Sequence, residues 1–230
     1  CGIIICIVLV DHLGYRKLFM LAAVPSLVGA ALIFLLIRER KTSDIYVPLS
    51  LKELSLNLRL FFAVSALFGL GAFSYSFFLI FAKESGFATG FVPVLYLVFT
   101  FTASVMSYPF GKLADRIGRK LVIEMSFALF AILCLGFLSL GKGGILPLFV
   151  VYGLHKGALE PVQRAFVSEL APASRKASIL GAYQMMLGVC ALVASVLAGI
   201  LWDMYGIEAP FIFSFAASVS SSVLLLFIRE

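Results

Sequence analysis

The sequence predicts an all-α protein, a polytopic bundle of transmembrane helices, and three observations support this prediction. Hydrophobic residues make up 62% of the chain and charged residues only 13%, and the mean hydropathy is +1.10. A soluble globular domain carries about 45–50% apolar and about 25% charged residues. The apolar residues fall into runs of about 20, the length that crosses the hydrocarbon core of a bilayer. Lys and Arg collect in alternate loops between these runs, as they do in membrane proteins.

The apolar runs predict about seven full spans and one partial span. The chain begins in apolar sequence at residues 1–10, which we interpret as the second half of a helix whose first half is missing, so that the chain is a fragment. Phe residues in the spans are expected to face lipid. The full spans are predicted at residues 18–37, 60–82, 91–110, 121–140, 145–168, 177–202 and 209–228.

The distribution of Lys and Arg predicts the orientation of these spans. Basic loops stay in the cytoplasm, so the richer side, and the C-terminus with it, is expected to be cytoplasmic, with the protein in the cell membrane. This division among short loops also makes the net charge of +6 a topology signal rather than a nucleic-acid-binding stripe. Twelve basic residues lie on the richer side: Arg38, Arg40, Lys41, Lys52, Arg59, Lys112, Arg116, Arg119, Lys120, Arg175, Lys176 and Arg229. Four lie on the other side: Arg16, Lys17, Lys83 and Lys142.

The longest polar connection divides the chain into predicted domains. Residues 1–37 are expected to end an N-terminal helical bundle, residues 38–58 to form a cytoplasmic linker, and residues 59–230 to form a C-terminal six-helix bundle. Within the linker, Ser50 and Glu53 have the spacing of a capping box, which predicts a short interfacial helix. A flexible tether is the alternative.

An internal repeat indicates that two similar halves exist. The segment DHLG at residues 11–14 recurs as DMYG at residues 203–206, an offset of 192 positions. Each copy is followed by one apolar span and then by the tripeptide Ile-Arg-Glu. Two copies of the same unit predict a protein with two related halves, of which only the end of the first is present here.

The decapeptide GKLADRIGRK at residues 111–120 joins two predicted spans, and it resembles the cytoplasmic signature GxLaDrxGrk of the major facilitator superfamily of transporters. This signature joins the second and third helices of each half in that family. The resemblance therefore implies the C-terminal portion of a twelve-helix transporter, from the end of helix five through helix twelve. The matching residues are Gly111, Leu113, Asp115, Arg116, Gly118, Arg119 and Lys120.

The residues of this signature have a physical rationale as a cytoplasmic gate. Gly111 and Gly118 permit a tight turn and close helix approach. Asp115 can face a neighbouring helix N-terminus, where the backbone dipole favours an anion. Arg116 and Arg119 can pair with carboxylates at adjacent cytoplasmic helix ends and so hold that face shut. The alternative is a basic turn that only sets the topology.

A second match supports the gate. Residues 168–172 read SELAP and are followed by two basic residues. This pattern resembles the turn after the tenth helix in sugar-porter-like members of the family. In those members the glutamate pairs with the arginines of the signature. The resemblance therefore implies an ion pair between Glu169 and either Arg119 or Arg116.

The predicted span at residues 145–168 carries an unusual density of ionisable residues. Lys156, Glu160 and Arg164 recur every four residues, so they share one helix face and can pair in sequence. Each charge facing lipid would cost about 2.5–3.5 kcal/mol on the mildest scale, so this face must meet the bundle interior or a wet cavity. Glu160 is either a proton-coupling carboxylate or an ion-pair partner. His155 is a further coupling candidate, although a single buried histidine is usually a hydrogen-bonded core residue.

Other polar positions in the spans are weaker candidates for contact with a substrate. Tyr75 follows small residues that interrupt the span at residues 60–82, and either a bent gate or close packing explains them. Gln184 and its neighbour Tyr183 could reach a substrate or form interhelical hydrogen bonds. Two seams for helix packing are predicted where small residues recur every four positions, at Ala191, Ser195 and Gly199 and at Ser214, Ser218 and Ser222.

These features favour a secondary active transporter that moves a small solute by alternating access, with protons as a candidate coupling ion. Its expected partners are the substrate, the lipid bilayer and the missing N-terminal half. The alternative is a non-transporting membrane protein, such as a sensor or assembly partner, on the same scaffold. An enzyme is not expected, because the sequence contains no GxxxxGK[ST], HExxH or GxSxG motif. No cofactor and no metal site are expected.

Overall fold

The computed structural model of the chain describes residues 17, 20–21, 23–36, 54–140 and 142–228. These belong to two compact units, Cys1–Pro48 and Leu49–Glu230. In the first unit the described residues include an apolar helix at Ala23–Leu36. The predicted partial span, the first copy of the repeat and the capping box of Ser50 and Glu53 lie outside the described residues.

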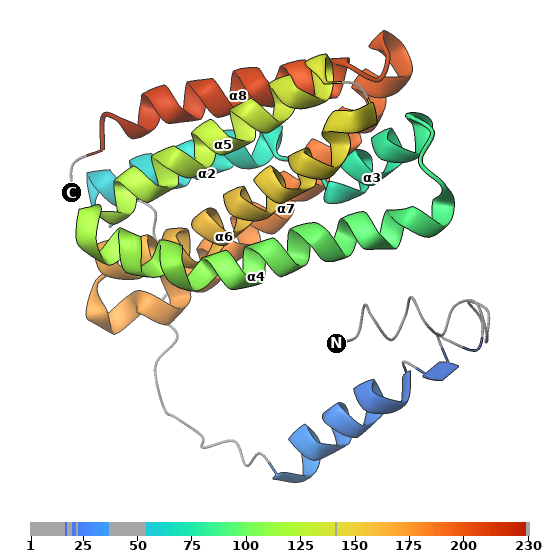
Figure 1. Cartoon of the computed structure of the whole chain (residues 1–230). Coiled ribbons are helices and arrows are strands. Elements are labelled where there is room, and N and C mark those ends of the chain that lie inside the picture. The colour runs from blue at the N-terminus through green and yellow to red at the C-terminus, as the bar shows by residue number, and fades with distance from the viewer. Residues whose placement is uncertain (1–16, 18–19, 22, 37–53, 141, 229–230) are drawn as a thin grey trace. The chain divides into compact units, whose positions relative to one another are not determined.

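The second unit is a bundle of long helices joined by short turns (Figure 1). All regular secondary structure described in this unit is helical, as predicted. The short connecting turns include three 3₁₀ helices, η2 (Thr89–Phe91), η3 (Lys142–Gly144) and η4 (Ala173–Arg175). The α-helices are α2 (Leu56–Gly71), α3 (Tyr75–Glu84), α4 (Val92–Ile117), α5 (Arg119–Ser139), α6 (Ile145–Leu170), α7 (Lys176–Tyr205) and α8 (Ala209–Leu225).

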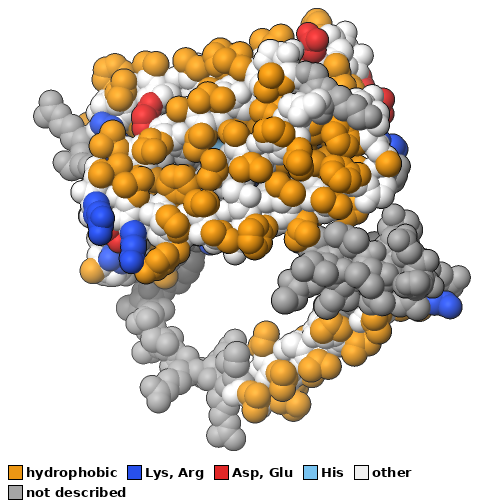
Figure 2. All heavy atoms as spheres, viewed as in Figure 1, with side chains coloured by type: hydrophobic (Ala, Val, Ile, Leu, Met, Phe, Trp, Pro, Cys, Tyr) orange, Lys and Arg blue, Asp and Glu red, His pale blue; other side chains and the backbone are white. Residues whose placement is uncertain are grey.

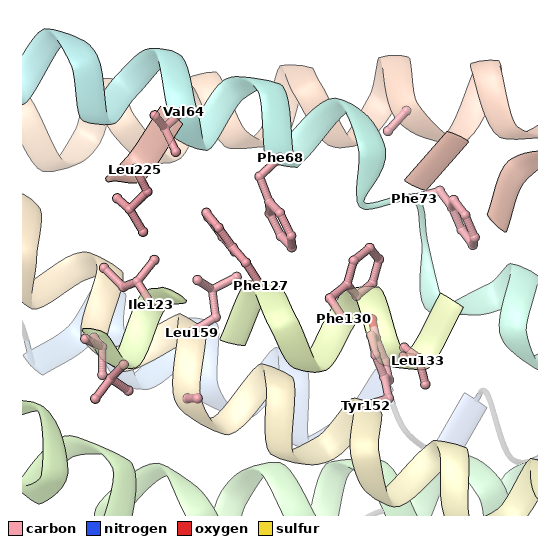
Figure 3. Close-up of a cluster of buried hydrophobic side chains, with 14 of the residues drawn as sticks. Val64, Phe68, Phe73, Ile123, Phe127, Phe130, Leu133, Tyr152, Leu159 and Leu225 are labelled. Atoms are coloured by element: carbon pink, nitrogen blue, oxygen red, sulfur yellow. The ribbon is translucent and has the colours of Figure 1, made fainter. Parts of the chain in front are cut away.

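α6, the helix with the charged residues predicted to face a cavity, packs against several other helices of the bundle. α6 packs against both α4 and α5, and α5 packs in turn against α8. α2 lies against α8 and α7 and so closes the bundle on the other side. Side chains from α2, α5, α6 and α8 meet in one apolar cluster (Figure 3).

Aromatic rings fill much of this interior, which corrects the expectation that the Phe residues face lipid. Phe68 of α2 stacks on Phe127 of α5 with ring centroids 4.3 Å apart. Eleven phenylalanines are buried: Phe61, Phe68, Phe73, Phe78, Phe99, Phe127, Phe130, Phe137, Phe149, Phe166 and Phe211. Phe buries a large apolar area and gains from edge and offset ring contacts, so a Phe-rich bundle places the rings inside.

The outer surface of the bundle is apolar, as expected of a membrane protein. Hydrophobic side chains cover most of the visible face of the bundle, and charged side chains gather near the helix ends (Figure 2). Four stretches of the described residues are long and apolar enough to cross a membrane: Leu56–Glu84, Val92–Ile117, Arg119–Ser139 and Ala173–Tyr205. α8 is shorter, and α6 carries several charged residues. The count of seven spans therefore stays a prediction.

The predicted span at residues 60–82 is two helices with a break at residues 72–74. Ser74 begins α3 by accepting a hydrogen bond from the Ser76 backbone N–H at 3.3 Å. At the end of α2, a Cβ built on Gly71 would lie 2.4 Å from the Cβ of Ala217 in α8. The close packing that the small residues predicted is therefore present at the break.

Serines of α8 form one of the two predicted packing seams. The other is not seen, because Ala191 is exposed and no described atom lies within 4 Å of a Cβ built on Gly199. The Ser214 hydroxyl donates to the Gly71 carbonyl at the break between α2 and α3. The Ser218 hydroxyl donates to the Phe127 carbonyl of α5 at 2.8 Å. The Ser222 hydroxyl donates to a carboxylate oxygen of Glu124, also in α5. Three turns of one helix therefore fasten α8 to two neighbours through hydrogen bonds that water cannot replace inside a bilayer.

A second seam, between α6 and α4, was not predicted. A Cβ built on Gly153 would lie 2.5 Å from the Thr102 Cβ, and one built on Gly157 would lie 2.8 Å from the Ala103 carbonyl oxygen. The two glycines are four residues apart, the GxxxG spacing that lets helix backbones approach closely. The GxxxG spacing of Gly153 and Gly157 is visible in the sequence, and it allows the charged helix α6 to pack closely against α4.

Candidate functional site

The signature at residues 111–120 is mostly helical, and its turn consists of one residue. α4 continues to Ile117, Gly118 adopts φ 97° and ψ 144°, and α5 begins at Arg119. Only glycine adopts this region of φ without strain, so Gly118 has the role that the sequence predicted. Gly111 does not, because it lies within α4 with no described atom within 4 Å of a Cβ built on it.

Arg119 connects three helices at this end of the bundle. Its guanidinium forms an ion pair with Glu169 at the end of α6 and also donates to the Ala165 carbonyl at 3.3 Å. A second nitrogen lies 3.7 Å from a carboxylate oxygen of Asp115 in α4. The predicted pairing of Glu169 is therefore present, and of the two candidate arginines its partner is Arg119. Arg116 is exposed.

Lys120 connects the signature to α8. Its ammonium donates to the carbonyls of Leu226 at 3.0 Å and Ile228 at 2.6 Å, which follow the last turn of α8. A cation suits this position, because carbonyls at a helix C-terminus lack intrahelical partners and carry partial negative charge. Leu113 of the signature packs against the apolar core.

A hollow of about 330 Å³ lies beside the Arg119 ion pairs. Residues of the signature line it on one side, and the end of α6 lines it on the other. The charged groups that hold these helix ends together therefore border open space rather than a packed interior. The lining residues are Ala114, Asp115, Gly118, Arg119, Phe166, Glu169 and Leu170.

The charged face of α6, made of Lys156, Glu160 and Arg164, is only partly paired. The Lys156 ammonium lies 3.4 Å from a carboxylate oxygen of Glu160, and their side chains are 34% and 51% exposed. Lys156 also lies over the Tyr152 ring, 5.9 Å from its centroid. Arg164 is exposed and forms no ion pair with any residue that the structure describes, so the predicted series of pairs stops at Glu160.

His155 is buried on a different side of α6 from the charged face. Its side chain lies against α5, where Nδ1 is 2.9 Å from the Ser126 carbonyl and 2.8 Å from the Ser126 hydroxyl. The Ser126 hydroxyl is also within 3.2 Å of the His155 carbonyl. The rings of Phe68, Phe130 and Tyr152 surround the imidazole. This is the environment of a hydrogen-bonded core histidine, the second of the two interpretations given to it.

A buried polar group lies between α2, α6 and α7, where Tyr183 forms the interhelical hydrogen bonds that were one of its two predicted roles. The Tyr183 hydroxyl is 3.0 Å from the Ser65 hydroxyl and 3.2 Å from the Gln163 side-chain carbonyl oxygen. Tyr183 is fully buried, whereas Gln184, the residue we selected as the candidate, is exposed. Successive residues on a helix point about 100° apart, so only one of the two neighbours can face the interior.

Ser65 and Gln163 border a small cavity of about 140 Å³ between α2, α5, α6 and α7. Lys156 is the one ionisable residue among those that line it, and Ser65 and Gln163 supply further polar groups. Tyr75 does not line this cavity. It lies at the start of α3 with its ring 5.4 Å from that of Tyr96. The lining residues are Phe61, Ser65, Phe68, Gly69, Ala72, Ile123, Phe127, Lys156, Leu159, Gln163, Leu187 and Ala191.

Glu124 is a carboxylate inside the apolar helix α5, and it was not among the predicted site residues. One of its oxygens accepts from Ser222, and the other is buried with no hydrogen-bond partner among the described residues. It is the one acidic residue in the apolar run at residues 121–140, which was a usable signal. It belongs to the contact between α5 and α8 and does not line the cavity.

Comparison with known proteins relates the chain to a family of transporters. The family model described as Major Facilitator Superfamily matches residues 60–230. An uncharacterized MFS-type transporter of Methanocaldococcus jannaschii is 30% identical over 224 residues, which is 94% of this chain and 56% of that protein. An uncharacterized MFS-type transporter of Mycobacterium tuberculosis is 30% identical over 119 residues, 51% of this chain and 21% of that protein. The chain therefore spans only part of the length of these curated relatives.

Among solved structures, the chain is similar to an auto-inhibited peptide transporter of the POT family. The TM-score is 0.59 at 14% sequence identity, over 76% of this chain and 37% of that one. At this identity the likeness concerns the fold alone. It shows that about three quarters of the chain follow the fold of a known transporter structure.

Proposed function

The chain belongs to the major facilitator superfamily, and we propose that it forms the C-terminal part of a secondary active transporter that moves a small solute across the cell membrane by alternating access. The family match over residues 60–230, the apolar outer surface and the relatives named as transporters support this proposal. The family consists of transporters rather than enzymes. The N-terminal half of the transporter would complete the substrate path.

The observation that carries the proposal is the charged face of α6 beside a cavity. Lys156 and Glu160 lie about midway along a 26-residue helix, and both side chains are partly exposed on the bundle surface. A lipid-facing position would cost about 2.5–3.5 kcal/mol for each charge. The face is therefore better explained as one wall of a water-filled path between two halves than as a lipid contact. A sensor or assembly partner would have no need of such a wall.

The signature supplies the cytoplasmic gate in this proposal. Arg119 holds the ends of α4, α5 and α6 together through Asp115 and Glu169. Its partners are partly exposed, and exposed ion pairs are weak, so the contacts can break and reform during a transport cycle. The break between α2 and α3 at residues 72–74 provides a point where one helix of the bundle can bend.

Glu160 is the proposed coupling residue. When its carboxylate is charged, it neutralises Lys156 at 3.4 Å. Protonation of Glu160 would leave Lys156 as an unpaired cation on the same face and so change the charge of the path by one unit. A substrate whose binding depends on that charge would then move together with a proton.

The test is solute accumulation in cells that express the complete transporter, in which this chain is joined to its N-terminal half. Cells with the wild-type protein, the E160Q variant and the E208Q variant are compared with cells that lack the protein, and intracellular solutes are quantified by mass spectrometry. Glu208 is an exposed loop residue outside the cavity, so E208Q is the matched control. We expect at least one solute to change with wild type and E208Q and to remain unchanged with E160Q. No change in any solute, with the protein folded in the membrane, would favour the non-transporting alternative.

A further inference from the structure

We propose that the cavity between α2, α5, α6 and α7 binds a small organic anion, with Lys156 as the counter-charge of its acidic group. This inference rests on the proposed function and assigns the class of substrate. It follows from three properties of the cavity: the hydrogen-bonding capacity left over on its walls, the position of Lys156 relative to Glu160, and the shape and size of its apolar part.

The polar groups on the cavity wall have donors left over. The Gln163 carbonyl oxygen is 3.2 Å from the Tyr183 hydroxyl, which donates to it. The Gln163 amide therefore offers its two N–H groups to the cavity, because an amide has one acceptor oxygen and one NH₂. Lys156 has three N–H groups, and one of them is directed to Glu160. A ligand rich in acceptors, such as a carboxylate, satisfies these donors, and an ammonium group does not.

The ion pair of Lys156 favours an anion over a cation. Lys156 lines the cavity, whereas Glu160 does not. A carboxylate that enters the cavity can therefore replace Glu160 on the ammonium without moving the helix. A cation that enters would first meet Lys156 and be repelled. The exchange requires little energy, because an ion pair whose side chains are 34% and 51% exposed contributes little to stability.

The rest of the cavity is apolar and of a defined size. The rings of Phe61, Phe68 and Phe127 line it together with Leu159 and Leu187. Its volume is about 140 Å³, and a dry cavity of about 150 Å³ in another protein holds one benzene molecule. The part of the ligand that enters this half of the site is therefore close in size to one ring, with its acidic group directed towards Lys156.

Three probes with the same ring separate the ligand classes: benzoate as the anion, benzamide as the neutral compound and benzylamine as the cation. Binding to the purified protein in detergent is measured by titration calorimetry. We expect benzoate to bind more tightly than either of the other two. K156Q should weaken benzoate binding by about tenfold or more, since a charge-assisted hydrogen bond is lost. E160Q should strengthen it by a few-fold, because Lys156 loses its internal competitor.

Three further variants separate this role of Lys156 from a structural one. K112Q removes an exposed lysine of α4, which lies over the Tyr108 ring and outside the cavity, and should leave benzoate binding unchanged. K156R keeps the positive charge and should retain binding. E160Q breaks the same ion pair as K156Q, so binding that is kept in E160Q and lost in K156Q cannot be attributed to loss of the pair. Q163E keeps the side-chain size, replaces two donors with acceptors, and should weaken benzoate binding.

Several outcomes would overturn the proposal. Preferential binding of benzylamine that E160Q abolishes would make the cavity a cation site. Equal loss of benzoate binding in K156Q and E160Q would make the pair structural. A wild-type protein that binds none of the probes would also overturn it. Flux in sealed vesicles distinguishes the two proposals: selective benzoate binding without any solute flux contradicts transport alone, and flux of cations alone contradicts the anion assignment alone.

Discussion

The close contact between Gly71 and α8 predicts that one added methyl group, in the variant G71A, strongly lowers the stability of the protein. A Cβ built on Gly71 lies 2.4 Å from the Cβ of Ala217, with the Ser214 Cα at 3.6 Å. Real Cβ atoms do not approach to 2.4 Å, and neither atom is the end of a flexible side chain, so G71A forces α2 and α8 apart. Overpacking of this kind costs about 1–3 kcal/mol of unfolding free energy.

The same substitution at a site with open space is the control. No described atom lies within 4 Å of a Cβ built on Gly188 of α7, so G188A should stabilise the helix by about 0.5–1 kcal/mol. A double-mutant cycle with A217G then isolates the contact. Removing the Ala217 methyl group restores the space, so G71A should cost less in the A217G background than in wild type.

The assay is thermal unfolding in detergent, followed by the reaction of a thiol-specific dye with the buried Cys134 and Cys190. In a chain of this size each kcal/mol corresponds to about 2–4 °C in Tm. We expect a lower Tm for G71A and an unchanged or higher Tm for G188A. A G71A protein as stable as wild type, or a cost that is the same with and without A217G, would refute the packing argument.

Three further predictions concern Gly118, the ion pair of Arg119 with Glu169, and Tyr183. G118A should cost about 1–3 kcal/mol in the same unfolding assay, because φ 97° is strained for any side chain; a neutral effect would mean that the turn can relax to negative φ. R119Q and E169Q should each lower the free energy of unfolding by about 0.2–1 kcal/mol. Both should also increase the labelling of a cysteine introduced in the adjacent hollow. The double variant R119E/E169R restores the ion pair with reversed charges and should bring this labelling back to the wild-type level. If the introduced cysteine is labelled as strongly in the swapped protein as in the single variants, the pair of Arg119 and Glu169 does not hold the cytoplasmic gate shut. Y183F should cost about 0.6–1.7 kcal/mol, the range for hydrogen bonds between membrane helices, with no effect expected if water replaces the hydroxyl.

The parts of the site that could be predicted are those contained in a short, specific pattern. Residues 111–120 have a spacing that one glycine turn explains, and the structure places that turn at Gly118. The pairing of Glu169 could be predicted because a second short pattern places a carboxylate at the matching helix end. The identity of its arginine could not be, since Arg116 lies in the last turn of α4 and Arg119 begins α5, and the sequence does not reveal which of them the turn at Gly118 directs towards Glu169.

The parts that could not be predicted depend on the rotation of each helix and on contacts between distant segments. Ser65 and Tyr183 are 118 positions apart, and nothing near either residue indicates the other. In a span that is apolar all round, the periodic signal that identifies the buried face is weak. Gln184 and Tyr183 were therefore not distinguished, although only Tyr183 is buried, and the Phe residues were assigned to lipid.

Two consecutive residues, Arg119 and Lys120, depend on different kinds of partner. The guanidinium of Arg119 needs the carboxylate of Glu169, so a substitution at either position removes the contact. The ammonium of Lys120 donates to the backbone carbonyls of Leu226 and Ile228, which are present whatever side chains stand there. Among homologous sequences, positions 119 and 169 should therefore change together, while positions 226 and 228 should vary independently of position 120. A joint pattern at 119 and 169 would mark a contact under selection for its charges, and variation at 226 and 228 that is independent of position 120 would mark a contact made through the backbone.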